Sequence, residues 1–231
     1  MQIIWMGHGS FRIEIGHQVV LVDPWINGNP MMEDQDTDAA ISGATHILVT
    51  HGHFDHTQDI VEISQKTGAP VSGMYELAQH LTGLGAVEGN AFNKGGTIVL
   101  GGEMTATMVP ASHSSSMATD KGAAYMGAEI GYILKGENRT IYFSGDTTVM
   151  ADMDWIGDIY KPDIGILSAG GYFTMGMGEA CYAAKRYFNF KTVIPCHYRT
   201  FDLLEQSADA LVVGLPEVDV IEPQVMQPIS L

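Results

Sequence analysis

Short apolar runs separated by glycine-containing turns dominate the start of the chain. Residues 2–6, 11–15 and 19–22 are rich in β-branched and aromatic side chains, and residues 7–9 and 16–17 interrupt them with glycine and histidine. Runs of this kind, bounded by turn residues, are typical of β-hairpins. The first part of the chain is therefore predicted to form antiparallel strands.

Farther along, the pattern changes to helices alternating with strands. Further strands are expected at residues 47–49, 97–100, 104–109, 129–134, 140–144, 164–167, 192–194 and 218–221. Apolar residues at helical spacing predict helices at residues 55–66, 74–84, 150–160, 178–188 and 202–213. Strands first and interleaved helices later predict a layered α/β fold, with one mixed sheet or with two sheets and helices outside them.

Two stretches lack this periodicity. Residues 33–38 are acidic and are expected to form a surface loop, whereas residues 111–127 are rich in Ser, Met and Ala and are typical of a loop over a functional site. No linker rich in Pro, Gly or Ser divides the chain, and no period of 20–50 residues recurs. We therefore expect residues 1–231 to form a single domain.

The charge balance restricts the classes of partner. Lys and Arg number 11 against 27 Asp and Glu, so the formal net charge is −16, which disfavours binding to a phosphate backbone. No apolar run approaches 18 residues, no signal peptide is evident, and the two cysteines cannot build a disulfide framework. The sequence predicts a reduced cytoplasmic protein that acts on a small-molecule substrate, not on nucleic acid or membrane, and it is compatible with a homo-oligomer.

One segment carries most of the chemistry. Residues 51–56 read HGHFDH, directly after the strand expected at residues 47–49. In extended backbone His51 and His53 point the same way and can reach one cation, whereas Asp55 and His56 would face a second point a few ångströms on. Imidazole and carboxylate suit Zn²⁺, Mn²⁺ or Fe²⁺. This spacing predicts a site for two metal ions.

Three further residues lie just beyond predicted strands. His113, Asp146 and His197 follow the strands expected at residues 104–109, 140–144 and 192–194. Functional side chains gather at strand ends in α/β folds. A carboxylate at such a point can bridge two cations, and we expect this role for Asp146.

Taken in order, these motifs resemble those of the metallo-β-lactamase superfamily of metal-dependent hydrolases. The H-x-H-x-D-H segment, an isolated His, an Asp in Gly-Asp-Thr and a late His match that family's pattern over the whole chain. Gly-His-Gly-Ser-Phe at residues 7–11, Asp-Pro at 23–24 and the glycine-rich segment at 170–176 resemble its lactonase-like branch. The resemblance implies an αββα sandwich of two mixed β-sheets flanked by helices, with the site at one edge.

The resemblance also implies a role for each candidate ligand. It implies two divalent metal ions per chain. Zinc is the first choice of metal, and manganese is the second. One ion would be held by His51, His53 and His113, the other by Asp55, His56 and His197, with Asp146 bridging. Asp23 resembles an aspartate that orients the ligand loop without binding metal.

Other residues admit two interpretations. His8, between two glycines, is either a hairpin tip or a catalytic residue that contacts substrate or a metal-bound water. Asp55 or His8 would then shuttle the proton. Arg199 is the best candidate cation for a substrate phosphate or carboxylate, and the backbone near Gly178 is either an anion site or a plain turn.

Together these features predict a dinuclear hydrolase in which a hydroxide bridging the metals attacks a small ester or lactone, expected to be anionic. The alternatives are a phosphodiesterase of the same fold and a non-catalytic metal-binding module. A di-iron redox enzyme is a third alternative, but His53 stands where such relatives of the family carry Glu. Elemental analysis separates these classes.

Overall fold

The computed structural model describes residues 1–231 and contains two seven-stranded sheets. The first comprises β1 (Gln2–Trp5), β2 (Phe11–Ile15), β3 (Gln18–Val22), β4 (His46–Val49), β5 (Val71–Met74), β6 (Glu88–Phe92) and β16 (Pro228–Ser230). The second comprises β7 (Thr97–Gly101), β8 (Met104–Pro110), β11 (Ile130–Gly136), β12 (Arg139–Phe143), β13 (Ile164–Ser168), β14 (Thr192–Cys196) and β15 (Asp219–Val220).

Both sheets are mixed in the same way. The first has the order β16-β1-β2-β3-β4-β5-β6 and is parallel from β3 to β6. The second has the order β15-β14-β13-β12-β11-β8-β7 and is parallel from β12 to β15. The remaining pairs are antiparallel.

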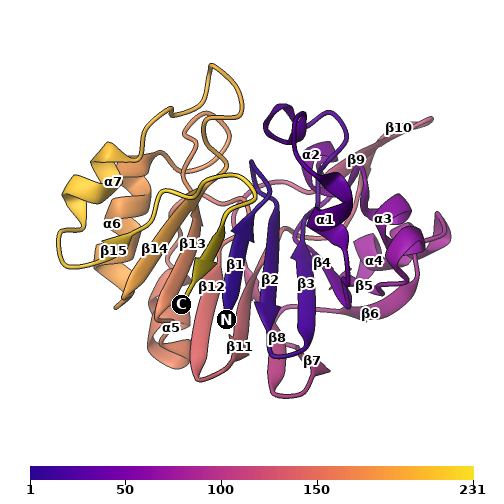
Figure 1. Ribbon diagram of the computed structural model, residues 1–231, viewed down its shortest axis with the longest axis horizontal. Coiled ribbons are helices and arrows are strands. Elements are labelled where there is room, and N and C mark those ends of the chain that lie inside the picture. The colour runs from indigo at the N-terminus through magenta and orange to yellow at the C-terminus, as the bar shows by residue number, and fades with distance from the viewer.

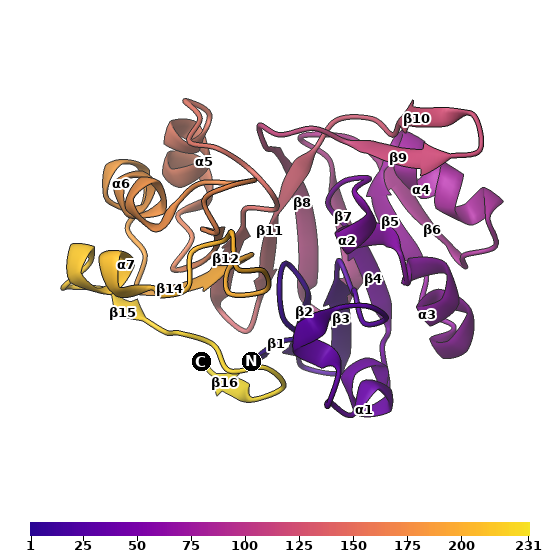
Figure 2. The same cartoon turned by 90° about the horizontal axis from the view of Figure 1, so that it is seen from above.

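Helices cover the outer faces of the sheets (Figures 1 and 2). They are α1 (Thr37–Ile41), α3 (Ile60–Thr67) and α4 (Tyr75–Gly83) beside the first sheet, and α5 (Met153–Tyr160), α6 (Met177–Tyr187) and α7 (Asp209–Gly214) beside the second. A short helix α2 (Phe54–Thr57) and a 3₁₀ turn, η1 (Pro30–Met32), complete the set. The predicted αββα sandwich is confirmed. None of the helices has the length and hydropathy to cross a membrane.

The inner faces of the two sheets meet in a continuous apolar core. Phe11 of β2 and Phe143 of β12 pack edge to face with their ring centroids 5.5 Å apart. The buried Tyr132 hydroxyl donates to the Val49 carbonyl and so links β11 to β4. β2 alternates buried and half-buried residues, whereas all five residues of β13 are buried, as expected for a strand covered on both faces.

Two predicted helices are shorter than expected because tertiary contacts compete for their residues. The helix predicted at 55–66 is divided into α2 and α3, since the Asp59 carboxylate accepts hydrogen bonds from the backbone of Ile26 and Asn27. The helix predicted at 202–213 exists only as α7. The segment before it bonds instead to the glycine-rich loop, with the Glu205 N–H donating to the Gly170 carbonyl.

The predicted loops also contain regular structure. Residues 33–38 run into α1, which Asp36 caps by accepting from the Ala39 N–H. The stretch 111–127 holds a separate hairpin, β9 (Ser116–Thr119) and β10 (Gly122–Tyr125). The strands β5, β6 and β16 are not among those predicted from the sequence, because their small and polar residues give no alternation of apolar and polar positions. In β5, Gly73 packs so closely that an added Cβ would lie 2.6 Å from the Val49 side chain.

The topology brings the functional segments to one edge. β1, β3 and β4 run in the same direction in the first sheet, and so do β8, β12 and β14 in the second. Their carboxyl ends carry the segments with His8, Asp23, residues 51–56, His113, Asp146 and His197. The β9–β10 hairpin lies at the same end of the molecule (Figure 1).

Candidate metal centre

The structure gathers all seven predicted ligand residues into one cluster, in which His51, His56, Asp146 and His197 are buried and His53, Asp55 and His113 are half-buried. Three groups of side chains have ligand atoms that lie within 4.8 Å of one another; one joins Asp23 to His51 and His56, and the other two contain predicted ligands, alone or together with His8. Of these other two, the first is His51, His53 and His113; the second is His8, Asp55, His56 and His197. The first group is the set implied by the family resemblance, and the second contains the implied set together with His8.

The first group has the spacing of a tetrahedral site. His51 Nε2 lies 3.0 Å from His53 Nδ1, and His113 Nε2 lies 3.3 Å from the same nitrogen. Two ring nitrogens bound tetrahedrally to zinc at about 2.0–2.1 Å would lie about 3.3 Å apart. These two distances are close to that spacing, and all three ligand atoms lie within 4.8 Å of one another, so the three imidazoles can converge on one ion.

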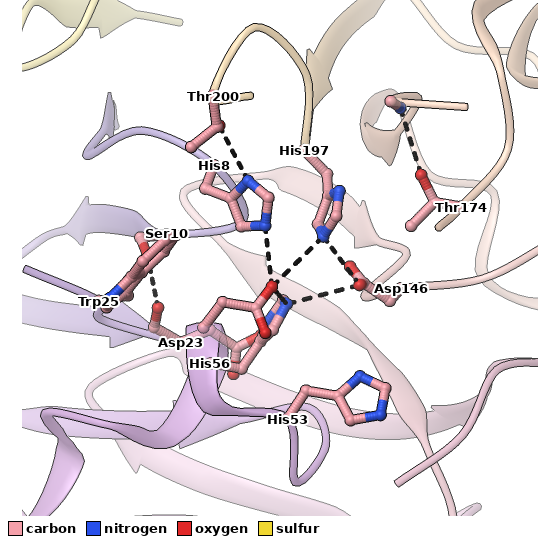
Figure 3. Close-up of polar contacts among 12 residues, drawn as sticks. His8, Ser10, Asp23, Trp25, His53, His56, Asp146, Thr174, His197 and Thr200 are labelled. Carbon is pink, nitrogen blue, oxygen red and sulfur yellow. Dashed lines mark hydrogen bonds and ion pairs between the residues drawn. The ribbon is translucent and has the colours of Figure 1, made fainter. Parts of the chain in front are cut away.

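Asp146 stands between the two groups. Its Oδ2 lies 3.0 Å from His197 Nε2, 3.5 Å from His56 Nε2, 3.7 Å from His113 Nε2 and 3.9 Å from His51 Nε2. The side chain is buried, and Figure 3 shows it pointing at the imidazoles of His56 and His197. This single oxygen faces imidazoles of both groups, which is the arrangement a bridging carboxylate requires.

The second group converges on Asp55. Its Oδ2 lies 2.9 Å from His8 Nε2, 3.5 Å from His56 Nε2 and 3.6 Å from His197 Nε2. His56 Nε2 is buried and makes no hydrogen bond. A buried polar atom without a partner is costly, and a ring nitrogen aimed at two carboxylates fits a metal ligand.

Asp23 holds two of the imidazoles in place. This buried carboxylate accepts hydrogen bonds from the Thr50 N–H and hydroxyl and from His56 Nδ1 at 2.8 Å. Thr50 Oγ1 in turn lies 3.0 Å from His51 Nδ1. Because both Nδ1 atoms are engaged, both Nε2 atoms are left for the cluster, and Asp23 has the orienting position that the resemblance implies.

The cluster keeps its carboxylates ionised. Burial raises the pKa of Asp146, but the neighbouring charges of His197 and His56 outweigh it and hold the pKa well below its usual value. Burial also raises the pKa of Asp55, and His56, His197 and His8 outweigh it in the same way. Two ionised carboxylates among imidazoles form a donor set suited to a divalent cation.

The same charges act on the imidazoles. Burial lowers the pKa of His197, but Asp146 outweighs it and raises the pKa to about 9. His8 behaves oppositely, because burial and the charge of His197 lower its pKa to about 4. His8 is therefore neutral at neutral pH.

His8 lies at the tip of the β1–β2 hairpin, but this tip is packed inside the molecule. The residue is fully buried, with a left-handed backbone (φ 52°). Its carbonyl accepts hydrogen bonds from the Trp5 indole and the His197 N–H, and its Nδ1 lies 2.9 Å from Thr200 Oγ1. These contacts place the imidazole of His8 against Asp55.

The two anion-binding candidates lie elsewhere or are occupied. The Arg199 guanidinium packs over the rings of Trp5 and Tyr198 and donates to the Pro223 carbonyl, so it turns away from the cluster. At the start of α6 the Gly176 N–H donates to the side chain of Glu179, so a carboxylate lies at this end of the helix.

The sequence pattern does not identify several residues that support the site. Thr50 and Thr200 hold histidines through their hydroxyls, and Gly170 is needed because an added Cβ would lie 1.8 Å from the His197 carbonyl oxygen. A signal existed for Thr50, which directly precedes the histidine segment. None existed for Thr200, since its partner His8 is 192 positions away.

Comparisons with known proteins identify the family and the fold. A model of the β-lactamase superfamily domain matches residues 18–198. A UPF0173 metal-dependent hydrolase of Roseobacter denitrificans is 61% identical over 99% of both chains, and one of Ruegeria pomeroyi is 59% identical over the full length of both. Igni18, a metallo hydrolase of Ignicoccus hospitalis, superposes with a TM-score of 0.84 at 28% identity, over 100% of this chain and 98% of the other.

The fold, the His and Asp cluster and these relatives lead to the same family. The family model covers most of the chain, and the curated relatives align from end to end. The chain belongs to the metallo-β-lactamase superfamily and is a metal-dependent hydrolase.

Proposed function

We propose that this chain hydrolyses a small ester or lactone with two divalent metal ions, zinc or manganese. The position of Asp146 carries the proposal, because its Oδ2 lies 3.0–3.9 Å from Nε2 of four imidazoles. One ion would be held by His51, His53 and His113, the other by Asp55, His56 and His197, and Asp146 would be shared.

Two ions bound there would lower the pKa of a water molecule and polarise the carbonyl oxygen of the substrate. The chain's own residues prepare this chemistry. Asp23 and Thr50 keep the Nε2 atoms of His56 and His51 directed at the cluster. The low pKa of Asp146 keeps its carboxylate ionised and available for sharing.

Asp55 and His8 are the proposed path for the proton. Their Oδ2 and Nε2 atoms are 2.9 Å apart, and both residues line the open pocket above the cluster. Because Asp55 stays ionised, a proton released when the substrate is attacked would be taken up at His8 Nε2, and the charge of Asp55 would stabilise it there. Thr200 fixes the other ring nitrogen of His8.

The test combines metal content with turnover. The purified protein is expected to hold about two zinc or manganese ions per chain and to hydrolyse members of a lactone and ester panel. His8→Ala is expected to leave the metal content unchanged and to reduce turnover. Iron with redox activity, or cleavage of phosphodiesters alone, would contradict the proposal.

A further inference from the structure

The pocket above the cluster has a floor of metal-ligand candidates and largely apolar walls. Its volume is about 600 Å³, within the range of small-molecule sites. The floor comprises His8, His53, Asp55, His113, Asp146 and His197. The walls comprise Phe54, Ser114, Ser116, Ala118, Phe173, Phe201 and Leu203.

No lysine or arginine lines this pocket. Arg199, the nearest cation along the chain, is held by the rings of Trp5 and Tyr198 and by the Pro223 carbonyl. If the substrate carried a phosphate or carboxylate away from its reacting bond, that group would be transferred from water into the pocket. No side-chain cation would pair with it there. Such a transfer is costly.

The walls offer apolar surface instead. Phe54, Phe173 and Leu203 are 61%, 50% and 53% exposed, although each borders the pocket. They come from α2, from the loop between β13 and α6 and from the loop after β14, so three separate segments present apolar side chains to one space. Phe201 packs edge-on to the imidazole of His8, with ring centroids 5.7 Å apart, which brings the apolar wall next to the candidate ligands.

From the apolar walls and the missing cation we infer that the preferred substrate is uncharged and carries an alkyl or aryl group. The carbonyl of the ester or lactone would face Asp146 and the imidazoles, and the apolar group would pack on Phe54, Phe173 and Leu203. This inference rests on the proposed function, and it replaces the anionic substrate expected from the sequence.

The test compares matched lactones on the metal-loaded enzyme. These are unsubstituted γ-butyrolactone, the same ring with a hexyl tail, and the same ring with a tail of equal length ending in a carboxylate. Because each buried methylene contributes about 0.8 kcal/mol and part of the tail stays in water, the hexyl tail is expected to raise kcat/KM about 10- to 100-fold. The carboxylate tail is expected to lose this gain.

Variants connect the preference to the walls. Phe173→Ala is expected to reduce the advantage of the hexyl tail by about 10-fold. The matched control is Tyr182→Ala, because Tyr182 is an aromatic residue of α6 with similar exposure (55%) that does not line the pocket. Leu203→Arg is expected to shift the preference toward the carboxylate tail, since it adds the missing cation.

Calorimetric binding of the three corresponding γ-lactams, whose amide resists hydrolysis, separates this inference from the proposed function. Lack of hydrolysis of every lactone and ester in the panel, combined with tightest binding of the hexyl lactam, would refute the function and support the inference. Lactone hydrolysis with equal or better use of the carboxylate tail would overturn the inference and leave the function intact. A full hexyl preference in Phe173→Ala would overturn it as well.

Discussion

Replacing Asp23 by Asn tests whether the orientation of the histidines controls metal binding. In the native chain the two carboxylate oxygens accept from the Thr50 N–H, from the Thr50 hydroxyl and from His56 Nδ1. Asn has nearly the same shape but only one acceptor oxygen. If that oxygen stays on the Thr50 N–H, the amide NH₂ faces His56 Nδ1.

The consequence is a change of tautomer. His56 Nδ1 must then accept a hydrogen bond, so the ring proton moves to Nε2, the nitrogen that faces Asp55 and Asp146 at 3.5 Å. A protonated Nε2 cannot bind a metal ion. Loss of a partner that orients a ligand costs about 10- to 100-fold in metal affinity, or about 1.4–2.7 kcal/mol.

The assay is a zinc titration of the chelator-treated protein against a chromophoric competitor, with elemental analysis of the saturated sample. Asp59→Asn is the matched control. Asp59 is also buried and accepts from the backbone of Ile26 and Asn27, but it does not touch the cluster. Both variants are expected to lose stability, and only Asp23→Asn is expected to lose zinc affinity. Unchanged zinc affinity in folded Asp23→Asn, or an equal loss in Asp59→Asn, would refute the reasoning.

Three further outcomes are expected. Asp146→Ala should lose at least one metal ion and nearly all turnover, because the shared oxygen disappears; two ions and a normal rate by elemental analysis and kinetics would exclude bridging. Removal of the metal by a chelator should lower Tm by about 8–16 °C. Metal at 1,000 times its Kd contributes about 4 kcal/mol to stability, and each kcal/mol shifts Tm by about 2–4 °C for a chain of this size. Calorimetry with and without re-added zinc checks this, and an unchanged Tm would contradict it. Gly170→Ala should cost about 1–3 kcal/mol or more in urea unfolding, because the new Cβ would lie 1.8 Å from the His197 carbonyl oxygen. Gly178→Ala in the same region meets no atom within 4 Å and should be neutral or stabilising, so an equal cost in both variants would contradict the steric argument.

Local patterns predicted the ligand cluster and most of the fold. The spacing of residues 51–56 places imidazoles and a carboxylate together over one turn of chain, and His113, Asp146 and His197 were identifiable by their positions after strands. The alternation of apolar and polar residues located β2, and a continuous apolar run located β13. These features depend on neighbours in the chain, so the sequence by itself determined them.

Contacts between distant segments decided the rest. His8 is a buried neighbour of Asp55 only because β14 brings His197 and Thr200 against it. Arg199 points away from the site because its guanidinium packs on the rings of Trp5 and Tyr198. Asp59 lies at the break between α2 and α3, in a segment whose own pattern favours one helix, and its carboxylate accepts hydrogen bonds from the backbone of Ile26, 33 residues away, and of Asn27. The apolar pocket walls likewise come from α2 and from two loops, which meet only in the folded chain. No local period encodes such partners, because the free energy of each contact depends on groups that only the tertiary structure brings together.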